Sequence, residues 1–168
     1  MQVRVEKGTV FLAGELSEHS VEQELKSAFH QAKASSGGAG PITVNLGELK
    51  HGNSSGLAMW LRVIKALDIP LLLTHVPVWM IYQLNDVAEM LSTYTSVESF
   101  YAPYYSAELD ESKNFFMRVG VDIVSQTVYD PKSLVRHEGA VVWEPDFECD
   151  YFLGFLQLLK NQGVEDSV

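Results

Sequence analysis

Segments with the hydrophobic spacing of strands and helices alternate through residues 1–103, and this alternation limits the fold more than any other feature. Alternating or continuous apolar residues predict strands at 3–5, 9–12, 42–46, 71–73 and 97–101. Helical spacing predicts helices at 21–32 and 57–67, and Pro77 is placed to begin a third. The run at 71–73 is apolar on both faces, which is typical of a central parallel strand. The order β-β-α-β-α-β-α-β predicts an α/β fold, with a mixed sheet of four or five strands and helices mainly on one side.

Residues 104–168 do not continue this alternation and are interpreted as a C-terminal α+β extension of a domain formed by 1–103. Phe115, Phe116 and Val119 suggest a short helix, and residues 121–128 suggest a strand. An apolar stripe at helical spacing follows at 152, 155, 156 and 159. Because such a stripe is too apolar to remain in water, we expect the extension to pack on the core or on a second copy, giving a homodimer in the second case.

The charge and the single cysteine limit the classes of partner and compartment. The formal net charge of −10 argues against nucleic acid or an anionic membrane as the main partner. Cys149 is the only cysteine, so neither an internal disulfide nor a cysteine-based zinc cluster is possible. The N-terminus has no apolar signal core, and no apolar run is long enough to span a bilayer. We therefore expect a cytoplasmic protein.

The segment His51-Gly52-Asn53-Ser54-Ser55-Gly56-Leu57 joins the predicted strand at 42–46 to the next helix. A serine at such a turn lies at the positive end of a helix, where backbone N–H groups lack partners. One interpretation is purely structural, since serine is a preferred N-cap. The other is that a phosphate added there changes the surface by about −1.5 to −2 charges and so switches binding.

The element order and several short motifs resemble the STAS domain, the fold of bacterial anti-sigma factor antagonists. The matching motifs are Gly14-Glu15-Leu16, Val44-Asn45-Leu46, Asn53-Ser54-Ser55-Gly56-Leu57 with the helix to Leu67, and Val76-Pro77. The family motif is usually Asp-Ser-Ser-Gly or Asp-Thr-Ser-Gly, and a partner kinase phosphorylates the hydroxyl residue before the glycine. The resemblance therefore implies phosphorylation at Ser55. Asn53 stands where the family has aspartate, which keeps the capping ability and removes a negative charge.

The resemblance implies a non-enzymatic regulatory protein that binds a serine kinase or anti-sigma-like protein, with a cognate phosphatase. Its expected contacts are Asn53, Ser54 and Gly56, joined by Met59 and Arg62, which lie off the predicted Leu57, Leu61 and Ile64 stripe. Two alternatives stay open. The first is a STAS-like scaffold that works without phosphorylation, and the second is a small-ligand-binding module.

Catalytic and metal-binding patterns are not found in the sequence. The histidines lack the spacing of a helical zinc site, and neither a phosphate-binding glycine loop nor a nucleophile elbow is present. His51 and His75 follow strands of the predicted sheet and could approach each other, but solvent-exposed loop histidines are the simpler interpretation. We therefore expect no catalytic residue, no metal and no cofactor.

Overall fold

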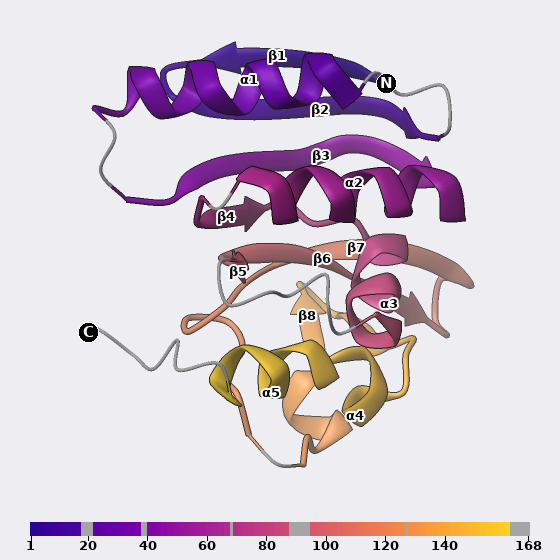
Figure 1. Ribbon diagram of the computed structural model, residues 1–168. Coiled ribbons are helices and arrows are strands. Elements are labelled where there is room, and N and C mark those ends of the chain that lie inside the picture. Colours follow the sequence, from indigo (N-terminus) through magenta and orange to yellow (C-terminus); the bar gives the residue numbers. More distant parts are fainter. Residues whose placement is uncertain (18–21, 38–39, 68, 88–94, 127, 162–168) are drawn as a thin grey trace.

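The computed structural model describes residues 1–17, 22–37, 40–67, 69–87, 95–126 and 128–161. Its elements, shown in Figure 1, are β1 (Gln2–Glu6), β2 (Thr9–Leu16), α1 (Glu22–Ser35), β3 (Ile42–Gly52), α2 (Ser54–Leu67), β4 (Leu71–Thr74), α3 (Val78–Asp86), β5 (Thr95–Val97), β6 (Ser99–Ser106), β7 (Glu111–Arg118), the 3-10 helix η2 (Pro131–Leu134), β8 (Arg136–Glu138), β9 (Val141–Pro145), α4 (Cys149–Phe152) and α5 (Gly154–Asn161). The predicted α/β class and the order of the first eight elements are confirmed. Val21 and Ser20, which were expected to start α1, lie outside the described residues.

The first sheet has five strands in the order β1-β2-β3-β4-β5. β1 and β2 form an antiparallel hairpin, and the following pairs are parallel, so the sheet is mixed as predicted. The hairpin turn places both Lys7 and Gly8 at positive φ, 48° and 81°. This pair of angles suits a two-residue turn, whose twist matches that of the strands it joins.

Side chains on one face of this sheet are buried beneath helices. The inward residues include Val10, Val44 and Leu73, each with no exposed surface. α1 and α2 lie on the same side of the sheet in Figure 1, and they meet through Phe29 and Trp60, whose rings pack edge to face at 6.1 Å. The period-two pattern of the strands therefore sets which face the helices cover.

β3 is longer than the sequence pattern predicts. It was expected to end at Leu46 and give way to a loop, but it stays paired with β2 as far as Gly52, which lies opposite Leu16. The register shifts twice, and at each shift β3 contains one more residue than β2. These bulges interrupt the apolar alternation that the prediction relied on, and they bring the serine turn to the end of β2.

The strand predicted at 97–101 is part of a longer, bent strand that belongs to two sheets. β5 pairs with β4, and beyond Glu98 the bridge between Val76 and Phe100 continues the pairing into β6. β6 then pairs with β7 in a second sheet of order β7-β6-β9-β8. Pro103 was expected to close the strand, but β6 runs on to Ser106, because its pairing with β7 continues from Pro103 opposite Asn114 to Ser106 opposite Glu111. The Pro103 carbonyl also accepts the N–H of Asp146. β6 thus crosses the boundary predicted at residue 103.

Two predicted elements of the extension are wrong. Phe115 and Phe116 were interpreted as helical, but they lie in β7, whose whole length pairs with β6. The alternation of Phe115, Phe116 and Met117 is that of a strand with one face inward, and Phe116 remains exposed. The described part of residues 121–128 forms no strand, and only Ile123 makes an isolated bridge.

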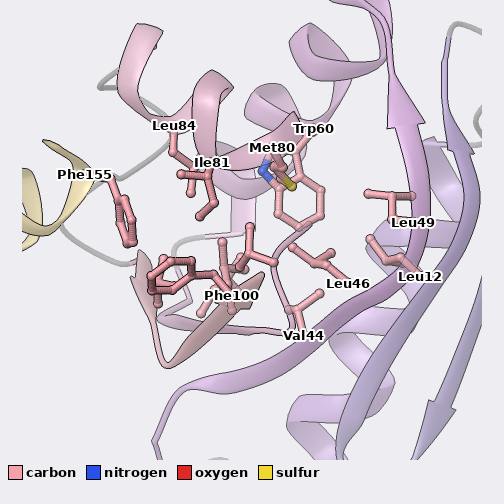
Figure 2. Close-up of a cluster of buried hydrophobic side chains, with 14 of the residues drawn as sticks. Leu12, Val44, Leu46, Leu49, Trp60, Met80, Ile81, Leu84, Phe100 and Phe155 are labelled. Atoms are coloured by element: carbon pink, nitrogen blue, oxygen red, sulfur yellow. The ribbon is translucent and has the colours of Figure 1, made fainter. Parts of the chain in front are cut away.

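The C-terminal apolar stripe is buried within the same chain. Phe152, Phe155, Leu156 and Leu159 are all buried, and they lie on two short helices, α4 and α5, separated at Leu153. Phe155 packs edge to face on Phe100 at 5.2 Å. Figure 2 shows the buried cluster extending from Leu12 and Val44, past Trp60 and Met80, to Phe100 and Phe155. The extension therefore continues the core of the first sheet.

Candidate functional site

The turn before α2 is capped by Asn53, and not by a serine as the purely structural interpretation proposed. The Asn53 Oδ1 accepts the Gly56 N–H at 2.9 Å, and the Asn53 carbonyl accepts the Leu57 N–H at 2.9 Å. Ser54 and Ser55 are the first two helical residues. Because the amide of Asn53 satisfies one of the first N–H groups, neither serine hydroxyl has to serve as the cap.

Gly56 is fixed against the end of β2. A Cβ at this position would lie 2.2 Å from the Leu16 carbonyl oxygen and 2.6 Å from the Ser17 nitrogen. The Asn53 N–H donates to the same Leu16 oxygen at 3.0 Å. Gly56 is buried, so it positions the turn and does not offer surface to a partner, in contrast to its predicted role as a contact.

Trp79, from the first turn of α3, packs against the end of β3, directly before the turn. A Cβ on Gly52 would lie 2.8 Å from the Trp79 ring, and the Trp79 indole N–H donates to the Leu49 carbonyl at 3.3 Å. Trp79 remains partly exposed. The sequence contained no signal for the Leu16 and Gly52 contacts.

Ser54 and Ser55 are both exposed in this otherwise tightly held turn. The first turn of α2 contains no acidic residue. Beside it, the His51 Nε2 lies 2.9 Å from a Glu15 carboxylate oxygen, so the ends of β3 and β2 are also joined by polar side chains. The geometry therefore presents two hydroxyls on a fixed backbone, at the positive end of a helix of 14 residues.

The two residues proposed on α2 have different positions. Met59 was expected to lie on the outer surface, but it is only 5% exposed, because the buried side of α2 is wider than the predicted stripe and also contains Trp60 and Val63. Arg62 is exposed, and its guanidinium contacts the Glu22 carboxylate at 3.1 Å. Hydrogen bonds from Lys26 and Arg62 hold the pKa of Glu22 below its ordinary value. Arg62 thus joins α2 to α1.

The two strand-end histidines have different neighbours. His75 lies at the end of β4, with its Nδ1 3.3 Å from the Asn45 Nδ2 and its ring 4.9 Å from that of Phe116. His51 lies further along β3, beside Glu15. Among the described residues, no group of three His, Cys, Asp or Glu side chains is arranged to hold a metal ion.

Comparisons with protein-family models, curated proteins and solved structures give no match for this chain. Of the helices in the described ranges, none combines the length and the apolar character needed to span a membrane.

Proposed function

We propose that this chain is a STAS-like, non-enzymatic regulatory protein of the anti-sigma factor antagonist type, controlled by phosphorylation of Ser55. The exposure of Ser54 and Ser55 on a rigid turn is the observation that carries the proposal. The backbone around them is held by Leu16 and Trp79, so a kinase or a partner would meet the hydroxyls in a defined geometry. The element order of the first sheet supports the STAS-like fold that the resemblance implies.

Phosphorylation at Ser55 would act through charge and solvation. A phosphate adds about −1.5 to −2 charges at a surface whose first helical turn has no carboxylate. A partner that covers the unmodified serine would have to desolvate this dianion, and every 1.4 kcal/mol lost lowers affinity about tenfold. The proposed partner is a serine kinase or anti-sigma-like protein that contacts Asn53, Ser54 and the exposed side of α2 near Arg62. A cognate phosphatase would reverse the modification.

Site-specific phosphorylation tests this proposal. The purified protein is incubated with candidate serine kinases and ATP, and the modified residue is located by mass spectrometry. Ser55→Ala should abolish the modification, whereas the matched control Ser54→Ala, one residue earlier on the same turn, should retain it. A phosphate that persists in Ser55→Ala, or that appears only on Ser54, would contradict the assignment. Once a partner protein has been identified, the Ser55→Asp variant should bind that partner more weakly than wild type does.

The second candidate is a STAS-like scaffold that binds its partner without phosphorylation. Asn53 favours it, because the neutral amide still caps the helix through the Gly56 N–H and lacks the negative charge that the family motif places near the acceptor serine. The comparison of wild type with Asn53→Asp separates the two candidates. A kinase that modifies Asn53→Asp and leaves the wild type untouched supports the scaffold.

A small-ligand-binding module has one observation in its favour. A hollow of about 580 Å³ lies beside the first sheet, lined by residues that include Met1, Gly14, Gly47 and Lys50. A thermal-shift screen tests this candidate, because a ligand that binds only the folded state raises the unfolding temperature.

A further inference from the structure

Lysine and arginine are distributed unevenly along the chain. Neither residue type occurs between Lys65 and Lys113, or between Arg136 and Lys160. These intervals contain α3 and α4, so these two helices carry carboxylates and no lysine or arginine. An acidic surface of this kind attracts a cationic partner and repels anionic ones.

Two tyrosines lie together where α3 meets α4. The rings of Tyr82 and Tyr151 have centroids 6.0 Å apart, and Tyr82 also packs edge to face on the buried Phe152 at 5.2 Å. Tyr151 is 45% exposed, although it is among the largest side chains of its helix. Rings held in this way form a contact surface at low cost in conformational entropy.

Carboxylates flank both rings. The Tyr151 hydroxyl donates a hydrogen bond to the Asp86 carboxylate, at the end of α3. Asp146 directly precedes Phe147, whose ring packs at 4.5 Å on Phe152, the same ring on which Tyr82 packs. Burial, and after it the negative charge of Asp146, raises the pKa of Tyr82. Asp86 and Asp146 are both exposed. The neighbouring side chains thus offer aromatic faces and negative charge in one place.

We propose that this surface, formed by Tyr82, Asp86, Asp146 and Tyr151, binds an arginine-bearing segment of a partner protein. A guanidinium can stack on a tyrosine ring while it donates two parallel hydrogen bonds to a carboxylate, whereas an ammonium group cannot do both. The Tyr82 and Tyr151 rings supply the stacking faces, and Asp86 and Asp146 supply the acceptors. The binding does not depend on Ser55 or on its phosphorylation, so its failure would leave the proposed function untouched.

A similar pair on β6 and the β6–β7 turn provides the control; it shares only the charge of Asp146 with the proposed surface, and both variants below leave Asp146 unchanged. Tyr105 is also exposed, and its hydroxyl also donates to an aspartate, Asp110, at 2.6 Å. The double variant Tyr151→Ala with Asp86→Asn and the control Tyr105→Ala with Asp110→Asn each remove one phenol ring and one negative charge. They therefore separate the chemistry of the proposed surface from an effect of net charge.

The probe is a fluorescently labelled peptide of arginine and glycine, and its binding is followed by anisotropy at low ionic strength. The Tyr151–Asp86 variant should bind the arginine peptide about tenfold more weakly than wild type, a loss of about 1.4 kcal/mol in binding free energy. The affinity of the Tyr105–Asp110 control for the same peptide should change less than about twofold. A lysine–glycine peptide should bind the wild type more weakly. Equal losses in both double variants, equal affinity for the two peptides, or no binding of the arginine peptide would each overturn the proposal.

A conservative variant shows whether a loss of peptide binding is due to misfolding. Tyr151→Phe keeps the ring and removes the hydroxyl that binds Asp86, so it should keep most of the affinity for the arginine peptide. Backbone amide shifts in an NMR titration should cluster on α3 and α4. Shifts that cluster on the β6–β7 turn would place the peptide elsewhere and overturn the assignment.

Discussion

Asn53 and Gly56 have complementary roles in the turn that presents the two serines. The Asn53 side chain closes the start of α2 through the Gly56 N–H, and the missing side chain of Gly56 lets the helix approach the Leu16 carbonyl. The serines between them make neither contact. Their side chains can therefore change without loss of the turn, as a modified residue requires.

Substitution of Asn53 should affect stability in a graded way. Asn53→Ala removes the oxygen that accepts the Gly56 N–H, and we expect the free energy of unfolding to fall by about 1 kcal/mol. Asn53→Asp keeps an acceptor and adds a negative charge at the positive end of α2. Its free energy of unfolding should therefore be higher than that of the alanine variant, and about 0.3–1 kcal/mol higher than that of wild type. Urea denaturation measures both. An aspartate variant as unstable as the alanine variant would show that the side chain does not cap the helix.

Gly56→Ala should be strongly destabilising, although it adds only one methyl group. Its Cβ would lie 2.2 Å from a backbone oxygen, which cannot move aside as a flexible side chain can. We expect a loss of about 1–3 kcal/mol, the usual range for overpacking. The matched control is Ser55→Ala on the same helical turn, where the side chain is exposed and the change should stay within about 0.5 kcal/mol. Equal effects of the two variants in chemical denaturation would argue against the close approach of α2 to β2.

Among the elements, α3 joins the first sheet to the C-terminal helices. In its first turn, Trp79 packs against Gly52 and donates to the Leu49 carbonyl in β3, and in its last turn the Asn85 Nδ2 donates to the Phe152 carbonyl in α4 at 3.0 Å. Met80, Ile81 and Leu84 have no exposed surface. The helix thus packs against the first sheet and the C-terminal helices at once, as Figure 2 shows for Met80, Ile81 and Phe155.

Truncation of one ring in α5 should therefore weaken the whole chain. Phe155→Ala leaves a cavity beside Phe100, and we expect it to lower the free energy of unfolding by about 3–5 kcal/mol. Denaturation should remain a single transition when it is followed both by tryptophan fluorescence and by far-ultraviolet circular dichroism. Two separate transitions would mean that the extension unfolds on its own and that α3 does not couple it to the first sheet.

For the molecule as a whole, buried phenols should set the alkaline limit of stability. Burial raises the pKa of Tyr104, whose hydroxyl donates to the Leu134 carbonyl at 3.0 Å, and burial also raises the pKa of Tyr129. In the unfolded chain these phenols ionise near their ordinary pKa of about 10. The unfolded state therefore loses its protons first, and stability that is complete below pH 10 falls as pH rises through the raised pKa of the folded state.

Tyr104→Phe should flatten this alkaline fall. The variant loses the hydrogen bond to Leu134, so its melting temperature at neutral pH should lie below that of wild type. Between about pH 9 and about pH 11 its melting temperature should decline less steeply, because one of the buried phenols is gone. Parallel curves for variant and wild type over that interval would exclude Tyr104 as the group responsible.

The sequence predicted those elements whose hydrophobic period is regular. The hairpin, α2 and the strand at 71–73 fall where the pattern indicates, and their neighbours along the chain are also their neighbours in space. β3 was predicted too short, because the two bulges break its alternation while distant residues of β2 still supply its hydrogen bonds. β7 was interpreted as a helix, because a short apolar run is compatible with either a helix or a strand. Only its pairing with β6, which the sequence does not show, makes it a strand.

The candidate site was predicted less completely than the fold. The Ser54 and Ser55 hydroxyls were placed at the start of a helix from local sequence alone, and they are found there. The contacts that hold them come from Leu16 and Trp79, which are distant in sequence and have no motif. Met59 was misplaced because the buried face of α2 also includes Met59, Trp60 and Val63 and is therefore wider than the predicted stripe.

The bent strand formed by β5 and β6 also orders events during biosynthesis. The chain leaves the ribosome N-terminus first, so the hairpin and the first parallel strands emerge before residues 95–106. Those residues give the first sheet its last strand and the second sheet an inner one. Phe100 reaches its final neighbours only after α5 has been synthesised. The edge of β4 therefore stays open until β5 has been synthesised, and the apolar surface around Phe100 stays open until α5 follows, so the nascent chain exposes first a sheet edge and then an apolar face.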